Sequence, residues 1–313
     1  MDYSVINAAI DDIVYIVNDY NKTRGYSVSL CERLVIALLG YYIVFGPSIF
    51  EKINIILESL EIYECNSIEE CCELKSTLVG SVNSNSNPAT SWDFKYDENK
   101  KFIGAIPRII YTKRDIVGDS FNLIHELSHV IEGTSGKVIK EDEKHFKYKQ
   151  SLCEVVVDKN NNRFFVNNRG IVELITIMIE NKFFKEFLKL DVGMIDNCIV
   201  REFLQRINIY KNKNVLLDSY SITSTMFSDL INNNYFFELV KKYYYNGERE
   251  LFALEYESYG DGLSFKVLVN CAEHLISGEL YDIMYYTNIL NKQIELFNKY
   301  SSYIPDKRIL LFV

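Results

Sequence analysis

Residues 119–133 read DSFNLIHELSHVIEG, and this stretch decides which fold the chain can form. The polar pair at 119–120 and the glycine at 133 mark the two ends of a predicted helix. Its two sides are lined mainly by apolar residues: Phe121, Ile124, Ser128 and Ile131 on one, and Leu123, Leu127 and Val130 on the other. Because two apolar sides need two covering surfaces, this helix is expected to be central, with other elements on both flanks.

Strand patterns lie on either side of this helix. Residues 100–113 (KKFIGAIPRIIYTK) are rich in β-branched and aromatic residues, which predicts a strand. Pro107 has no backbone N–H to donate, so this strand is expected at a sheet edge or at a bulge. After the helix, residues 151–158 (SLCEVVVD) and 163–168 (RFFVNN) flank a polar KNNN turn, which predicts a β-hairpin.

The outer parts of the chain follow helical patterns. Residues 1–79 predict helices, the following GSVNSNSNPATS (80–91) predicts a loop, and nearly everything from Gly170 onward predicts helices again. We therefore expect an α+β protein with a small mixed β-sheet packed on the central helix. Its regions would be an N-terminal helical region (1–79), a core (80–190) and a C-terminal helical domain (191–313).

One uncharged stretch, residues 34–50, approaches the length of a membrane span, which needs about 20 residues. Gly46 and Pro47 interrupt it, and residues 48–51 (SIFE) form a capping-box pattern that opens a new helix, IFEKINIILESLEIYE. The pattern favours a buried helix followed by a turn, so no membrane contact is expected. A membrane-associated protein that uses this stretch is the alternative.

Charge and cysteine usage narrow the class of protein. The chain has 34 basic and 43 acidic side chains and a net charge of −9, which argues against nucleic acid as a partner. Its 7 cysteines include no Cys-x-x-Cys spacing, which favours reduced thiols in the cytoplasm. Asp2, Asp11 and Asp12 lie where a signal peptide would carry positive charge. Nothing in the sequence indicates an oligomeric state.

The central helix carries the pattern His-Glu-x-x-His. Residues four apart share a helix face, so His125 and His129 can both reach one Zn²⁺ at about 2.0–2.1 Å. Glu126 lies about 100° around the helix and is placed to reach a water molecule instead of the metal. It is the candidate general base and acid, and the cofactor is predicted to be Zn²⁺.

This motif resembles the active-site helix of the zincin metallopeptidases. The metzincin branch is excluded, because its glycine and third histidine would fall on Glu132 and Ser135. The gluzincin, thermolysin-like branch takes a glutamate from a later helix as third ligand, and the resemblance implies Glu173 in that role together with a zincin-like fold. The pattern departs at Ile177, where that branch has an aspartate that orients a zinc histidine. Thr176 or a backbone carbonyl is the expected substitute.

Glu173 is also singled out by its neighbours, because it interrupts the apolar residues 171–175 and a buried carboxylate needs a partner such as a metal ion. The alternative is a carboxylate on a solvent-exposed stripe together with Glu180. Other acidic or imidazole ligands would be Glu154, in a strand pattern, and Asp142 or His145 beside the charged residues 140–144.

A transition state at such a metal needs a second stabilising donor. His274 is the candidate for this catalytic role, although a core histidine has the same pattern. The tyrosines that offer the same chemistry, each of which also fits a packing role, are Tyr243, Tyr244, Tyr245, Tyr256 and Tyr259.

These features together predict a zinc-dependent metallopeptidase that hydrolyses peptide bonds in a peptide or protein substrate. The strand around residues 109–111 is expected to bind extended substrate by strand addition. The alternative is a non-catalytic interaction module that keeps the zincin architecture. Glu126 argues for the enzyme, because an inactive relative gains nothing from that carboxylate.

Overall fold

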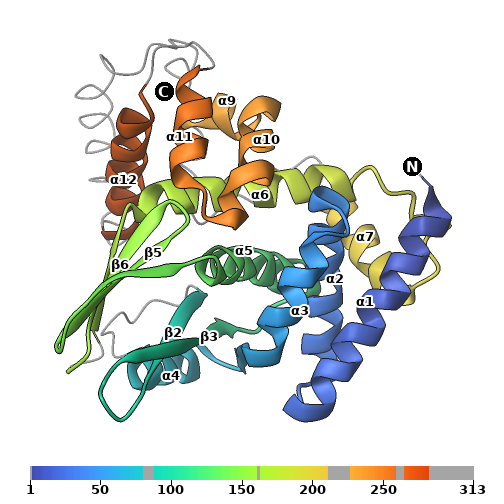
Figure 1. The fold of residues 1–313 in the computed structure, drawn as a ribbon. Helices are drawn as coiled ribbons and strands as arrows, with labels where there is room; N and C mark the ends of the chain where they lie inside the picture. Colours follow the sequence, from blue (N-terminus) through green and yellow to red (C-terminus); the bar gives the residue numbers. More distant parts are fainter. Residues whose placement is uncertain (1, 80–87, 161–162, 211–225, 259–263, 282–313) are drawn as a thin grey trace. The chain divides into compact units, whose positions relative to one another are not determined.

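The computed structural model describes residues 2–79, 88–160, 163–210, 226–258 and 264–281 (Figure 1). The described chain is α+β, as the sequence predicts, but its strands form two small sheets instead of the single sheet expected. It forms two compact units, and neither is one continuous stretch. The first comprises Met1–Ile131, Lys159–Arg163 and Lys182–Asn214. The second comprises Glu132–Asp158, Phe164–Asn181 and Val215–Val313.

The first unit begins with three helices, α1 (Tyr3–Arg24), α2 (Val28–Phe45) and α3 (Ile49–Ser59). The turn expected at Gly46 and Pro47 is confirmed, because α2 ends at Phe45 and its C-cap is Gly46. Helix α3 begins at Ile49 as expected. The capping box is wrong, since the Ser48 side chain makes no cap hydrogen bond to the described backbone.

Helix α2 is long and apolar enough to cross a membrane by length and composition, but 56% of it is buried inside the protein. The Tyr41 hydroxyl donates a hydrogen bond of 2.8 Å to the Ile124 carbonyl oxygen. The Tyr41 ring also meets Phe183 edge-to-face, with ring centroids 4.9 Å apart. These contacts are those of a helix in the core of a folded unit.

Gly40 in α2 tests this packing. A Cβ at this position would lie 2.5 Å from the buried Phe183 ring, so Gly40→Ala is expected to lower the free energy of unfolding by about 1–3 kcal/mol. The higher helix propensity of alanine offsets part of that loss. Thermal unfolding measures the effect, and Gly104→Ala is the control, because no described atom lies within 4 Å of its added Cβ. An unchanged melting temperature for Gly40→Ala would contradict the packing of α2 on Phe183.

The first sheet consists of β1 (Glu61–Cys65), β2 (Ala89–Tyr96) and β3 (Phe102–Thr112), in the order β1-β3-β2. The strand predicted at 100–113 is confirmed as β3, but the edge position is wrong. β3 is central, parallel to β1 and antiparallel to β2. Pro107 is tolerated there because it lies opposite Trp92 of β2, while the pairing with β1 starts only at Arg108.

Two further expectations for this region are wrong. The helix predicted to run through Glu64 ends at Ser59, and β1 follows it. The loop predicted for 80–91 overlaps β2, which begins at Ala89, while residues 80–87 lie outside the described residues. Between β1 and these residues lies helix α4 (Ile68–Val79). β1 pairs with β3, which lies beyond α4 and β2 in the sequence, so local patterns do not reveal its partner. β2 pairs with β3 as its neighbour in the sequence, and the loop pattern at 80–91 hid its first residues.

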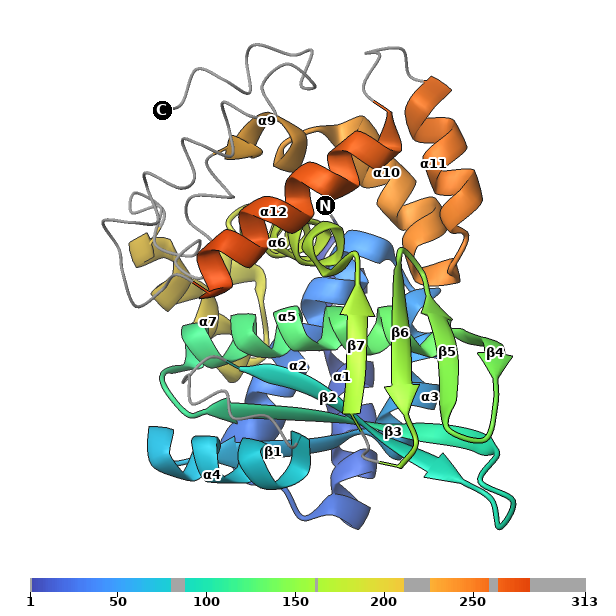
Figure 2. The same ribbon diagram turned by 90° about the vertical axis from the view of Figure 1, so that its left-hand side faces the viewer.

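Helix α5 (Ile116–Thr134) is the predicted central helix. It starts earlier than expected because the Asp115 carboxylate, instead of Asp119, accepts the backbone N–H groups of Val117 and Gly118. Figure 2 shows α5 running over the sheet. Its apolar residues Leu123, Ile124, Leu127, Val130 and Ile131 are at most 1% exposed. Helix α7 (Cys198–Tyr210) contributes Phe203, whose ring lies beside Phe121.

The second unit contains most of a four-stranded sheet of order β4-β5-β6-β7. Its strands are β4 (Lys137–Glu141), β5 (His145–Gln150), β6 (Cys153–Asp158) and β7 (Arg163–Asn167). The β6–β7 pairing confirms the predicted hairpin. The charged residues 140–144 form the end of β4 and the turn into β5.

The remaining elements are helical, as predicted from Gly170 onward. They are α6 (Arg169–Phe187), η1 (Val192–Met194), α9 (Ser228–Ile231), α10 (Asn234–Tyr243), η3 (Tyr244–Asn246), α11 (Arg249–Ser258) and α12 (Phe265–Tyr281). Helices α5 and α6 each contribute residues to both units.

Candidate metal centre

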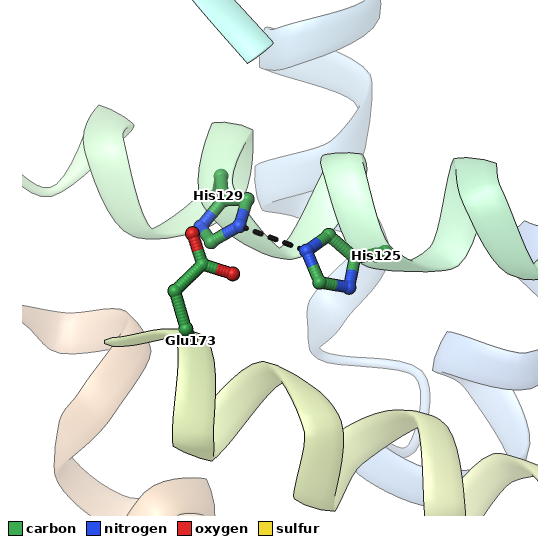
Figure 3. Close-up of side chains that lie close together, drawn as sticks. All are labelled: His125, His129 and Glu173. Carbon is green, nitrogen blue, oxygen red and sulfur yellow. Dashed lines mark hydrogen bonds between the residues drawn. The ribbon is translucent and has the colours of Figure 1, made fainter. Parts of the chain in front are cut away.

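The structure brings His125, His129 and Glu173 together (Figure 3). One ligand atom from each, an imidazole nitrogen or a carboxylate oxygen, lies within 4.8 Å of the other two. The histidines come from α5 and the glutamate from α6. These are the three residues that the sequence predicts as metal ligands, and as a group they could hold a metal ion.

The spacing of the two imidazoles fits a tetrahedrally coordinated cation. Their Nε2 atoms are 3.3 Å apart and their ring planes are inclined by 71°. Two nitrogens bound at 2.0–2.1 Å in tetrahedral geometry are about 3.3–3.4 Å apart, so the separation of the two Nε2 atoms fits one shared ion. Both histidines are only partly buried, which leaves this side of the helix open to a ligand.

Glu173 is held by the first turn of α6. Its carboxylate is only 2% exposed, and Oε1 accepts a hydrogen bond of 3.0 Å from Arg169 Nε. The Gly170 backbone N–H donates to Glu273 Oε2 of α12 at 2.7 Å, and a Cβ on Gly170 would meet the Glu273 backbone at 2.4 Å. The close approach of α12 therefore requires glycine at this position and anchors the turn that presents Glu173.

This burial contradicts the alternative in which Glu173 lies on a solvent-exposed stripe. It also changes the argument for a metal partner. Arg169 already supplies positive charge, although its side chain is 53% exposed and the pairing is partly screened by solvent. Burial therefore does not by itself require a metal at Glu173. The case for ligation is the position of the carboxylate beside two imidazole nitrogens.

The substitution Glu173→Gln tests the third ligand. The fold is expected to survive, because glutamine keeps the shape and can still accept from Arg169, while zinc affinity should fall by at least about 10-fold. Competition titration against a chromophoric chelator measures this affinity. Arg169→Met is the matched variant: it removes the ion pair and leaves the carboxylate, so it should retain zinc. Undiminished affinity in Glu173→Gln would assign the third position to another group.

Glu126 is 4% exposed and is not one of the three grouped ligands. Its Oε2 atom accepts a hydrogen bond of 2.6 Å from the Thr90 hydroxyl of β2. The same hydroxyl lies 3.1 Å from the Glu126 carbonyl oxygen. Thr90 was missed by the sequence analysis, because residues 80–91 read as a loop and nothing local indicates a strand that reaches α5.

The competing ligands are placed elsewhere. Glu154 in β6 pairs with Lys147 Nζ at 2.5 Å. Asp142 and His145 lie at the exposed β4–β5 turn, with Oδ1 and Nδ1 3.6 Å apart. None of the three belongs to the metal-ligating group found among the described residues. Thr176, a candidate for orienting a zinc histidine, donates its hydroxyl to the Val172 carbonyl oxygen within α6.

The candidates for a second stabilising donor differ in burial. His274 lies exposed on α12, which contradicts the alternative of a core histidine and leaves its catalytic role a prediction. Tyr259 lies outside the described residues. Tyr243 donates to the Glu255 carboxylate, and the rings of Tyr245 and Tyr256 pack against Tyr244 and Phe236 respectively.

Tyr244 differs from these residues. It is fully buried, and its hydroxyl has no hydrogen-bond partner among the described residues. Burial raises its pKa well above the usual value, and the buried carboxylates Glu132 and Glu173 act in the same direction. The phenol therefore stays a neutral hydrogen-bond donor. A buried hydroxyl without a partner costs about 1–3 kcal/mol, so Tyr244 has a donor to offer a ligand.

Glu132, a buried polar residue near the C-terminal end of α5, was also not predicted from the sequence. Glu132 is 2% exposed, and its Oε1 accepts from the Cys153 thiol at 3.5 Å. Burial, followed by Glu132, raises the Cys153 pKa well above its usual value, so the thiol remains protonated. Cys153 is therefore a hydrogen-bond donor in this environment and is not an activated nucleophile.

No protein-family model, no curated protein and no solved structure matches the chain. The function is therefore inferred from the residues of the site.

Proposed function

We propose that this protein is a zinc-dependent peptidase with a zincin-like active site, in which His125, His129 and Glu173 hold the metal. The observation that carries the proposal is the 3.3 Å separation of the two Nε2 atoms. The Glu173 carboxylate belongs to the same group of ligand atoms. Two imidazoles and one carboxylate suit Zn²⁺ and leave a fourth position open, as in catalytic zinc sites.

Different groups at the site would carry out different steps of peptide hydrolysis. A bound zinc ion would supply a Lewis acid that activates water and polarises the scissile carbonyl. Glu126 takes the proton of the attacking water and returns it to the leaving amine, since its carboxylate is adjacent to the ligands in sequence without being one of them. The Tyr244 phenol and the His274 imidazole are the groups offered to stabilise negative charge on the carbonyl oxygen.

Strand β2 replaces residues 109–111 as the proposed substrate-binding edge. Residues 109–111 are paired on both sides, with β1 and with β2, so they cannot accept another strand. Among the described strands, β2 has β3 as its only neighbour, and its other edge offers backbone groups to an extended peptide. Thr90 of this strand donates a hydrogen bond to Glu126, which supports the proposal that a peptide on this edge lies next to the general base.

The proposal is tested with a mixed peptide library, because the preferred sequence is unknown. Zinc-loaded protein is expected to produce new peptide termini, detected by mass spectrometry, and a chelator should stop their formation until zinc is restored. Zinc-loaded protein that cleaves no member of the library would favour the non-catalytic interaction module instead.

A further inference from the structure

The contact between Thr90 and Glu126 joins an edge strand to the active-site helix. Side chains alternate along a strand, so Thr90, Trp92 and Phe94 share one face of β2, and Ser91 and Asp93 share the other. Asp93 on the second face accepts a hydrogen bond from Arg108 Nη2 at 2.7 Å. The Thr90 face is the one directed at α5, because its hydroxyl reaches Glu126.

The Thr90 hydroxyl has one proton and two oxygen atoms of Glu126 within reach. Oε2 is at 2.6 Å and the carbonyl oxygen at 3.1 Å. The 2.6 Å contact has the length of a strong O–H···O hydrogen bond and is the stronger of the two possibilities. The proton therefore belongs to Oε2, and the carboxylate is held in one orientation with Oε1 turned away from the hydroxyl.

We propose that Thr90 is a positioning residue for Glu126: its hydroxyl holds the carboxylate so that the other oxygen faces the attacking water. This inference rests on the proposed peptidase function. General-base efficiency depends on orientation, because proton transfer requires hydrogen-bond distance between the base and the water.

Thr90 lies on β2, so peptide binding along this strand should affect catalysis as well as binding. The strand proposed to bind the peptide backbone is the strand that holds the base. A peptide that adds to β2 therefore stiffens the residue that orients Glu126, and substrate length along β2 should influence kcat as well as KM.

Three variants separate the hydroxyl from the rest of the side chain. Thr90→Val keeps the shape and removes the donor, so kcat should fall by about 10-fold while KM and zinc content stay within twofold of wild type. Thr90→Ser restores the donor and should restore most of kcat. Thr112→Val is the matched control, because it makes the same change in the same sheet, where the Thr112 hydroxyl has no hydrogen-bond partner among the described residues.

A binding measurement provides a readout that does not need turnover. Acetohydroxamic acid gives up one proton, which a nearby carboxylate can accept, and its anion chelates zinc through two oxygens. Its affinity for the zinc-loaded protein, measured by calorimetry or by the fluorescence of the single tryptophan, Trp92, should fall about 10-fold in Glu126→Gln. Thr90→Val should show a loss of several-fold, and Thr90→Ser and Thr112→Val should match wild type.

The outcomes distinguish this inference from the proposed function. Equal kcat and equal hydroxamate affinity in Thr90→Val and wild type would overturn the role of Thr90 and leave the peptidase intact. If wild type binds zinc and hydroxamate but cleaves no peptide, the peptidase fails, and the hydroxamate affinities decide whether Thr90 positions Glu126. A wild-type protein that binds no zinc overturns both.

Discussion

The zinc-loaded variant Glu126→Gln is expected to retain its metal and its thermal stability and to lose peptide hydrolysis by about 10²- to 10⁴-fold, the usual contribution of a positioned general base. The metal is retained because Glu126 is not one of the three grouped ligands. Stability is retained because the amide oxygen of glutamine can still accept the Thr90 hydrogen bond. The base is lost because an amide does not take a proton from water near neutral pH.

Three measurements on the same preparations check this result: cleavage rates on the peptide library, zinc content and melting temperature. Glu154→Gln is the matched control, since it makes the same change at a carboxylate that pairs with Lys147 outside the metal group. Zinc-dependent cleavage at equal rates in wild type and Glu126→Gln would refute the proposed mechanism. Loss of zinc from Glu126→Gln would instead make Glu126 a ligand.

The second large effect is expected for the metal itself. Protein purified without added metal should contain close to one Zn²⁺ per chain, because two imidazoles and a carboxylate form a three-ligand site. His129→Ala removes one nitrogen and should release the ion, since the remaining His125 and Glu173 are too few to hold it against dialysis. Elemental analysis of dialysed protein in solution measures both quantities.

His145→Ala is the control for this experiment. It removes an imidazole from the exposed β4–β5 turn, outside the metal group, so it should keep the wild-type zinc content. Wild-type protein that contains no transition metal, and takes up none when zinc is added, contradicts the central claim. Equal zinc content in His129→Ala and wild type would show that the metal is held somewhere else.

Local patterns predicted the elements whose partners are close in sequence. The helix around His125 follows from apolar periodicity that lies within one helix, and the turn at Gly46 follows from residues that cannot continue a helix there. The β6–β7 hairpin was equally accessible, because its polar turn joins two adjacent strands.

The errors concern pairings between distant segments. The predictions placed β3 at an edge from Pro107 and extended a helix through Glu64, because the pairing of β1 with β3 joins residues that no local window contains. The predicted start of α5 was also wrong, because two aspartates near it could cap the helix. Asp115 is the one that does so, and Asp119 instead pairs with Arg33 Nε at 3.2 Å.

The sequence by itself determined the chemistry of the candidate site: a helix with two imidazoles on one face and the adjacent carboxylate of Glu126 about 100° around the helix, which the 3.6-residue repeat places without help from the rest of the chain. The tertiary structure decided which of the candidate ligands joins the two imidazoles and which residue contacts Glu126. Only folding brings Glu173 of α6 to the imidazoles and Thr90 of β2 to Glu126. These contacts depend on packing between elements that lie far apart along the chain, which periodicity cannot encode.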